Sequence, residues 1–308
     1  MNDDYAFLIP AGGLGSRLYP LTKEFPKPCL PIYVSDNNDV IRLIDLPIMF
    51  CKKNNIPVYI ALDYKKEKLK YLEDLDSVKV IYTNYEKLSE AVLALLKEAS
   101  FDDINYYSVY AADFLIPTEV INKMMNLINC STETVALCSK NNDYSKIKLK
   151  SDRGRLSYSK GEDVTDLTFH VGMVNKGIDC FRSLIDKDIT SVWDYLYPRE
   201  DEKETVKARL LVTDVDHIDA GLPDSYYEVV YKLNHDRVDG NGNIVFPGAK
   251  INSDSKNVIA LPNSDSSNIV LENCIVPENL IVESYDDVLS VDSSRKEYFG
   301  KIKIKDFM

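Results

Sequence analysis

The chain has 308 residues, of which 45% are hydrophobic and 28% are charged, and its formal net charge at pH 7 is −12. This length allows one large domain with a smaller appendage, and the apolar content suffices for a sizeable core. The negative charge argues against sequence-independent binding of nucleic acid. No apolar run reaches the roughly 18 residues of a membrane span, and the acidic, polar start is unlike a signal peptide. We therefore expect a cytoplasmic protein.

Over the first 140 residues, apolar runs of strand length alternate with stretches in which apolar residues recur at helical spacing. This alternation predicts an α/β fold with a mostly parallel, doubly wound, Rossmann-like sheet. The expected strands are residues 5–10, 58–62, 78–82, 106–112 and 134–139. The expected helices are residues 40–54, 65–74, 89–98 and 118–129.

The pattern changes after residue 144. Residues 144–174 contain short alternating segments around a turn at Asp152, which predicts antiparallel strands over the edge of the sheet. Helical spacing returns at residues 179–185, 192–197 and 224–233. We expect the first domain to comprise residues 1–235.

Residues 236–308 have a different character, because Asn, Asp, Ser and Gly separate short apolar pulses. The pulses predict a small β-rich C-terminal domain. A plain β-sheet cap and a solenoid of irregular repeat both stay open. A solenoid has unpaired outer faces that often stack on a partner, so a homo-oligomer is a further expectation.

A glycine-rich loop follows the first expected strand, within residues 8–32. Its glycines let backbone N–H groups approach phosphate oxygens without interference from a Cβ atom. Arg17 and Lys27 add two positive charges to the same loop. The combination predicts a nucleoside triphosphate site. The nucleotide-binding candidates in this loop are Ala11, Gly12, Gly13 and Gly15.

Two commoner glycine loops do not fit this segment. A Walker A loop ends in Gly-Lys-Ser/Thr, whereas this loop continues from Gly15 through Ser16 to Arg17. A dinucleotide fingerprint needs a third small residue, where this chain has Leu18. An ordinary glycine turn beside a stray arginine stays as the alternative.

The loop resembles the signature of the sugar-phosphate nucleotidyltransferases, Gly-Gly-x-Gly-x-Arg-Leu-x-Pro-Leu-Thr followed by Pro-Lys-Pro. Residues 41–47, Ile-Arg-Leu-Ile-Asp-Leu-Pro, are similar to a segment of the ADP-glucose pyrophosphorylases. The second likeness favours the adenylyltransferase branch. These adenylyltransferases carry a left-handed β-helix at the C-terminus, so the resemblance implies that the C-terminal pulses form a short one.

The resemblance implies an enzyme that joins an NTP and a sugar-1-phosphate into an NDP-sugar and releases pyrophosphate. Such a transfer depends on holding two anions in line and on neutralising the charge that develops. Arg17 would bind the departing β- and γ-phosphates. Lys27, whose loop is stiffened by two prolines, would stabilise charge at the α-phosphate. The alternative for Lys27 is a solvated surface lysine.

Two aspartates stand where the family places its ligands for Mg²⁺, a cation that prefers hard oxygen donors. Asp113 follows an apolar strand, in the place of the family's Gly-Asp, and Asp219 lies in a segment similar to its Asp-x-Gly-Thr-Pro turn. The alternatives are a helix N-cap for Asp113 and a turn aspartate for Asp219.

The sugar phosphate would be held by Lys160, which stands in the place of the family's Glu-Lys-Pro, and approached by the strand that contains Gly172. Both neighbours of Lys160 differ from the family pattern, so an exposed lysine is an equal alternative. The base-recognition segment departs further. Where the family reads Gly-Thr-Ala, this chain has Ser89 and Glu90 before Ala91.

The changes at Glu90 and around Lys160 leave two functions open. The first is an active, Mg²⁺-dependent nucleotidyltransferase, for which glucose-1-phosphate and ATP are favoured and a cytidylyl or guanylyl donor with another phosphorylated acceptor is the alternative. The second is a catalytically weak regulatory subunit or paralogue of such an enzyme. Retention of Arg17, Lys27, Asp113 and Asp219 favours the first.

Overall fold

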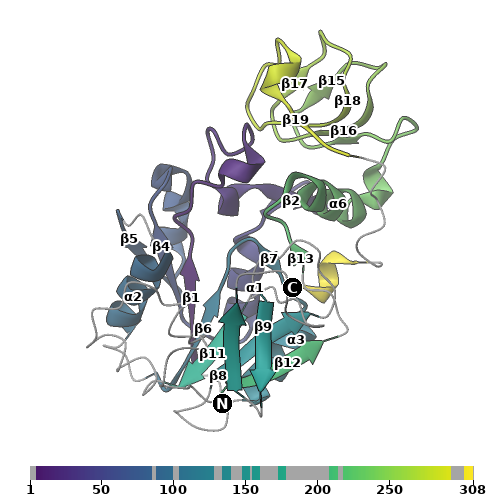
Figure 1. The fold of residues 1–308 in the computed structure, drawn as a ribbon. Coiled ribbons are helices and arrows are strands. Elements are labelled where there is room, and N and C mark those ends of the chain that lie inside the picture. Colours follow the sequence, from purple (N-terminus) through teal and green to yellow (C-terminus); the bar gives the residue numbers. More distant parts are fainter. Residues whose placement is uncertain are drawn as a thin grey trace. The chain divides into compact units, whose positions relative to one another are not determined.

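The computed structural model describes residues 5–84, 88–99, 104–127, 134–139, 148–152, 155–159, 173–177, 208–213, 218–292 and 302–307 of the chain. These residues form two compact units (Figure 1). The first collects residues 1–13, 47–112 and 116–217, and the second collects residues 14–46, 113–115 and 218–308. The sequence-based boundary at residue 235 stays a prediction. The packing groups residues 218–235 with the C-terminal segment.

A seven-stranded sheet forms the centre of the first unit, in the order β12-β8-β11-β6-β1-β4-β5. Strands β6, β1, β4 and β5 run parallel, and β11 runs antiparallel to both of its neighbours. The strands are β1 (Tyr5–Pro10), β4 (Val58–Leu62), β5 (Val78–Tyr82), β6 (Tyr106–Tyr110), β8 (Thr134–Ser139), β11 (Met173–Gly177) and β12 (Ala208–Thr213). The α/β class predicted from the sequence is confirmed.

The connections are helical where the apolar spacing predicts helices, with two differences. They are α1 (Asp45–Lys53), the 3₁₀ helix η3 (Lys66–Asp74), α2 (Leu88–Ala99) and α3 (Thr118–Leu127). Val40–Arg42 is not helical, because it pairs as β3 with β2 (Pro31–Val34). Lys65 has a φ of 51°, a left-handed conformation that an α-helix cannot accommodate. The helix expected from residue 65 therefore begins at Lys66, and it is the tighter 3₁₀ helix η3. A hairpin of β9 (Lys148–Asp152) and β10 (Arg155–Ser159) agrees with the antiparallel strands expected there.

The helices expected at residues 179–185 and 192–197 lie outside the described residues. Within the described residues, none of the helices has both the length and the apolarity that a bilayer crossing requires.

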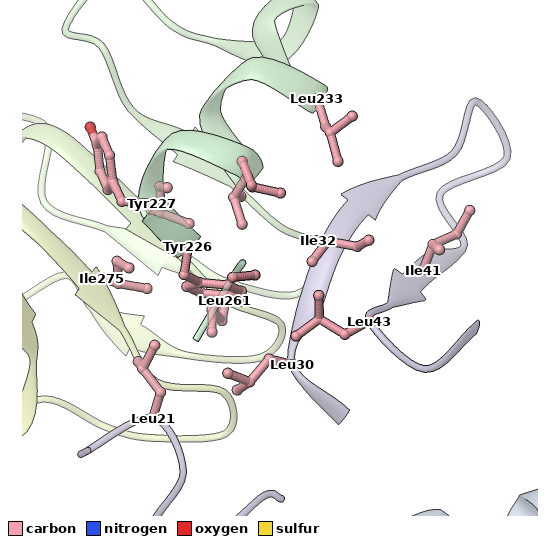
Figure 2. Packing of buried hydrophobic residues seen from close by; sticks show 14 of the residues in the cluster. Leu21, Leu30, Ile32, Ile41, Leu43, Tyr226, Tyr227, Leu233, Leu261 and Ile275 are labelled. Atoms are coloured by element: carbon pink, nitrogen blue, oxygen red, sulfur yellow. The ribbon is translucent and has the colours of Figure 1, made fainter. Parts of the chain in front are cut away.

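The second unit combines an N-terminal segment, a helix and a C-terminal stack of strands. Its elements before the stack are the 3₁₀ turns η1 (Ser16–Leu18) and η2 (Lys27–Cys29), β2, β3, β7 (Phe114–Leu115), β13 (Ile218–Asp219), α6 (Pro223–Leu233) and η4 (His235–Arg237). Figure 2 shows Leu21 and Leu30 of the N-terminal segment in one cluster with Tyr226 of α6 and with Leu261 and Ile275 of the stack. All five side chains are at most 2% exposed. Burial of this apolar surface stabilises the unit.

The C-terminal strands stack in parallel coils. Ile244 pairs with Ile259 and Ile259 with Ile275, so that the coils repeat after about 15 residues. The strands are β14 (Ile244–Val245), β15 (Lys250–Ile251), β16 (Lys256–Ala260), β17 (Asp265–Ser266) and β18 (Glu272–Val276), followed by η5 (Tyr285–Asp287), the antiparallel β19 (Leu289–Ser290) and η7 (Ile304–Asp306). The β-rich C-terminal segment is thus present. Its left-handed winding stays a prediction.

Left-handed residues recur at two corners of the coils. Gly242, Asn257 and Asn273 occupy one corner with φ values of 82°, 52° and 51°. The amide of Asn257 donates to Oδ1 of Asn273 at 3.0 Å, so the corner side chains stack between coils. Asparagine tolerates this conformation better than other residues with a Cβ atom. The second corner repeats the pattern with Gly248, Asn263 and Asn279.

Candidate active site

Lys27 lies on a turn whose backbone is fixed by hydrogen bonds. The N–H of Cys29 donates to the carbonyl of Pro26 at 2.8 Å, and the N–H of Leu30 donates to that of Lys27 at 3.0 Å. Cys29 and Leu30 are each 1% exposed, whereas the Lys27 side chain keeps 23% of its surface exposed. The turn therefore presents the partly exposed Lys27 from a hydrogen-bonded backbone whose next residues are buried.

Asp113 and Asp219 are brought together by two short strands. β7 follows Asp113 directly, and it pairs antiparallel with β13, which ends at Asp219. The N–H of Ala220 donates to the carbonyl of Asp113 at 2.9 Å, which extends the ladder by one residue. The two aspartates predicted as a pair are thus neighbours in the second unit.

Lys27 and both carboxylates surround Gly221. Lys27 Nζ donates to Asp113 Oδ2 and forms an ion pair with it. A Cβ atom placed on Gly221 would lie 2.6 Å from Asp219 Oδ1, 3.0 Å from Lys27 Nζ and 3.1 Å from Asp113 Oδ2. One cation and two anions therefore converge on a point that only glycine leaves empty.

The electrostatics of Asp219 reflect this crowding. Burial raises the pKa of its carboxyl, and the negative charge of Asp113 raises the pKa further. The N–H of Gly221, which donates to Asp219 Oδ1 at 2.7 Å, and the charges of Lys27 and Arg17 lower it, without cancelling the rise. A second cation close to the two carboxylates would relieve the repulsion between them.

The glycines of the loop differ in backbone conformation and in the atoms that surround them. Gly15 has a φ of 64°, and a Cβ atom there would lie 2.9 Å from Thr22 Cγ2 and 3.0 Å from Lys27 Cβ. Thr22 Oγ1 donates to the Gly15 carbonyl at 3.0 Å, which ties this corner to the segment leading to Lys27. Arg17 lies on η1 and is exposed. These three predicted residues, Gly15, Arg17 and Lys27, share the second unit.

In the first unit, the loop begins where β1 ends. Ala11 is buried, and its N–H donates to the carbonyl of Ala61 at 2.9 Å. A Cβ atom on Gly12 would lie 2.9 Å from Cβ of Asp63, so packing against the end of β4 explains this glycine. Gly13 is exposed, with no heavy atom of the described residues within 4 Å of such a Cβ. Protein packing does not require a glycine there, whereas close approach of a ligand to the backbone would.

Two further predicted residues, Ser89 and Glu90, belong to the first unit. Ser89 and Glu90 lie in the first turn of α2, where Glu90 is half-buried. Lys160 and Gly172, the candidates for holding the sugar phosphate, lie outside the described residues.

The place of Gly221 in the cluster and the packing of Gly12 against Asp63 were not predicted from the sequence. The signal for Gly221 is its place two positions after Asp219, because a residue without a Cβ atom leaves room beside that carboxylate. Asp63 has no motif around it, and only the packing of Gly12 against it reveals its place.

The described residues contain no cluster of three or more His, Cys, Asp or Glu side chains arranged to hold a metal ion. Two carboxylates nevertheless fit Mg²⁺, which commonly takes one or two from the protein and completes its shell with water and substrate phosphates. Asp113 and Asp219 are the residues that would hold it.

Comparison with known proteins supports the sequence-based resemblance. Residues 7–144 match the model of a family described as nucleotidyl transferase. A 70-residue segment is 36% identical to the glucose-1-phosphate adenylyltransferase small subunit, chloroplastic/amyloplastic, of Triticum aestivum. This segment spans 22% of the chain and 14% of the wheat protein. The predicted likeness to nucleotidyltransferases is therefore confirmed over the N-terminal part of the chain.

Solved structures share the fold at low sequence identity. Mannose-1-phosphate geranyltransferase from Thermus thermophilus aligns with a TM-score of 0.63 and 16% identity, over 94% of this chain and 95% of that chain. A Bacillus anthracis protein assigned provisionally as a glucose-1-phosphate thymidylyltransferase aligns with a TM-score of 0.58 and 15% identity, over 73% of this chain and 94% of that chain. Both likenesses concern the α/β architecture.

Proposed function

We propose that the protein is a Mg²⁺-dependent nucleotidyltransferase that joins an NTP and a sugar-1-phosphate into an NDP-sugar. A phosphate oxygen of the sugar-1-phosphate forms a bond to the α-phosphorus, and the bond from that phosphorus to the bridging oxygen of pyrophosphate breaks. No covalent enzyme group is needed. ATP and glucose-1-phosphate are the favoured pair, because the wheat relative bears that name and residues 41–47 resemble the adenylyltransferase branch.

The convergence of Lys27, Asp113 and Asp219 on Gly221 is the observation that carries this proposal. A transfer between two anions needs fixed positive charge where negative charge develops, and Lys27 supplies it from a rigid turn. Ion pairing with Asp113 keeps the ammonium oriented. Arg17, exposed on η1, is suited to the departing pyrophosphate.

Asp113 and Asp219 would hold Mg²⁺, which supplies positive charge to the phosphate oxygens when it is bound. The raised pKa of Asp219 supports this role, because two crowded carboxylates favour a cation. Gly13 supports the triphosphate loop, since its missing side chain has no explanation in the packing of the described residues.

Release of pyrophosphate, measured for ATP, CTP, GTP and UTP against a panel of sugar-1-phosphates with and without Mg²⁺, tests the proposal. We expect turnover with at least one pair, dependent on Mg²⁺, and most rapid with ATP and glucose-1-phosphate. Absence of turnover with every pair would favour the regulatory alternative. Turnover with an NTP other than ATP would support the proposed reaction and identify a different nucleotide donor.

A further inference from the structure

A partly buried ion pair connects the C-terminal coils to the turn that carries Lys27. Arg42 Nη1 donates to Glu278 Oε2 and Nη2 donates to Glu278 Oε1, each at 2.9 Å. The side chains of Arg42 and Glu278 are 21% and 7% exposed. A two-pronged contact of this kind fixes the plane of the guanidinium as well as its position.

The same guanidinium also holds the turn. Arg42 Nη1 donates to the carbonyl of Cys29, which is the last residue of η2. Backbone bonds from the next segment reinforce this contact, because the N–H of Ile44 donates to the carbonyl of Pro28 at 3.0 Å. The carbonyls of Pro28 and Cys29, which directly follow Lys27, are thus held by the Arg42 segment.

Each member of this chain of contacts is itself held in place. The backbone N–H of Arg42 donates to Asp45 Oδ2 at 2.8 Å, and its guanidinium carbon lies 6.0 Å from the centre of the Phe25 ring. Glu278 precedes Asn279, a left-handed corner residue whose N–H donates to the carbonyl of Pro262 at 3.0 Å. The corner of the coil therefore fixes the backbone from which the Glu278 side chain reaches Arg42.

We propose that Arg42 and Glu278 are positioning residues for Lys27, through which the C-terminal coils orient the catalytic lysine. Glu278 orients Arg42, Arg42 holds the Cys29 carbonyl, and the turn directs Lys27 Nζ toward Asp113. The effect on catalysis rests on the proposed function, whereas the effect on the turn does not. Neither residue touches the reacting groups in this scheme.

The first test replaces one partner at a time, with Glu278→Gln and Arg42→Lys. Displacement of a catalytic group by about 1 Å lowers the rate by up to roughly a hundredfold, so we expect kcat to fall about ten- to a hundredfold while both KM values change by less than about threefold. Lys250→Gln is the matched control. It removes an ion pair of the same coils, Lys250 with Asp265 at 3.4 Å, on a side chain that is 69% exposed. We expect it to keep the wild-type kcat.

The second readout needs no catalysis. The Cys29 thiol is buried on the turn, so its alkylation by iodoacetamide, followed by peptide mass spectrometry, reports how firmly the turn is held. We expect the Cys29 rate to rise about tenfold or more in both variants, relative to Cys51 in the same molecule. Cys51 is buried in α1 and serves as the internal reference.

A double variant guards against loss of folding, because Glu278→Gln leaves the Arg42 charge without its partner and Arg42→Lys cannot make the two-pronged contact. Arg42→Leu/Glu278→Leu removes both charges, an exchange that proteins often tolerate. It still removes the bond to Cys29, so we expect low kcat and fast alkylation of Cys29. Wild-type kcat and wild-type protection of Cys29 in the folded variants would overturn the inference. If the wild-type protein turned over no substrate pair, the proposed function would fail and the alkylation rates would still decide this inference.

Discussion

Asp113 and Asp219 lie side by side because the N–H of Ala220 donates to the carbonyl of Asp113, which continues the ladder between β7 and β13. Asp113 and Ala220, which are about a hundred positions apart in the chain, are thereby joined by a backbone hydrogen bond of an antiparallel pair. The position of both carboxylates is set by backbone pairing. We therefore expect the pairing of β7 with β13 to persist when either side chain is replaced.

Replacement of Lys27 should abolish most activity and leave the fold intact. Lys27→Ala removes the cation at the site of charge development, and loss of one such group lowers kcat roughly 100- to 1,000-fold. Steady-state pyrophosphate release measures the loss, and circular dichroism checks the fold. Lys52→Ala, which changes an exposed lysine on α1, is the control. A near-normal rate for Lys27→Ala would remove this lysine from the mechanism.

Gly221→Ala should impair catalysis more than stability. The added methyl group meets the ends of three side chains, Asp219 Oδ1, Lys27 Nζ and Asp113 Oδ2, which can swing away without moving the backbone. We expect kcat to fall about tenfold or more, since small displacements of reacting groups are costly. The melting temperature should change little. Gly240→Ala is the matched control, because a Cβ atom there meets nothing within 4 Å among the described residues; equal rates for the two variants would contradict the prediction.

The stability of the metal-free protein should depend on the protonation of Asp219. Burial first, and Asp113 second, raise the pKa of its carboxyl, so the folded protein binds this proton more tightly than the unfolded chain. Between the ordinary aspartate pKa and the raised one, the folded state holds more protons. The free energy of unfolding therefore falls as the pH rises through that window.

Asp219→Asn removes this titration. In urea denaturation with EDTA between about pH 4 and pH 7, we expect the variant to lose less stability with rising pH than the wild-type protein does. Asp224→Asn serves as the comparison, because Asp224 accepts a hydrogen bond from the N–H of Asp292 at 3.1 Å and lies outside the cluster. Parallel stability curves for Asp219→Asn and the wild type would refute the assignment.

The left-handed corners of the coils should be sensitive to side chains at their glycines. Gly248 has a φ of 75°, and a Cβ atom there would lie 2.2 Å from Oδ1 of Asn263. We expect Gly248→Ala to lower the free energy of unfolding by about 1–2 kcal/mol, the cost of a left-handed residue with a Cβ atom. Chemical denaturation measures it, with Gly240→Ala as the control. An unchanged midpoint would show that the corner relaxes freely.

The sequence indicated the α/β class and the members of the cluster for separate reasons. Apolar spacing fixed the strands because buried parallel strands are continuously hydrophobic, while Lys27, Asp113 and Asp219 followed from motifs. Residues 40–42 were expected to be helical because Val40 and Ile41 continue the apolar spacing of α1. Their pairing with β2 is a tertiary effect that local spacing does not contain. The ion pair between Arg42 and Glu278 was likewise not predicted, since no motif links positions so far apart.

The second unit is assembled from three stretches that are far apart in the sequence. This arrangement affects how the protein folds during its synthesis. Residues 14–46 leave the ribosome long before residues 218–308, whose apolar side chains, among them Tyr226 and Leu261, cover Leu21 and Leu30. Domains generally fold in the order of their synthesis, and here the early stretch has no finished core to join. We therefore expect the apolar side chains of residues 14–46 to stay exposed through most of translation. Such exposure favours binding by chaperones.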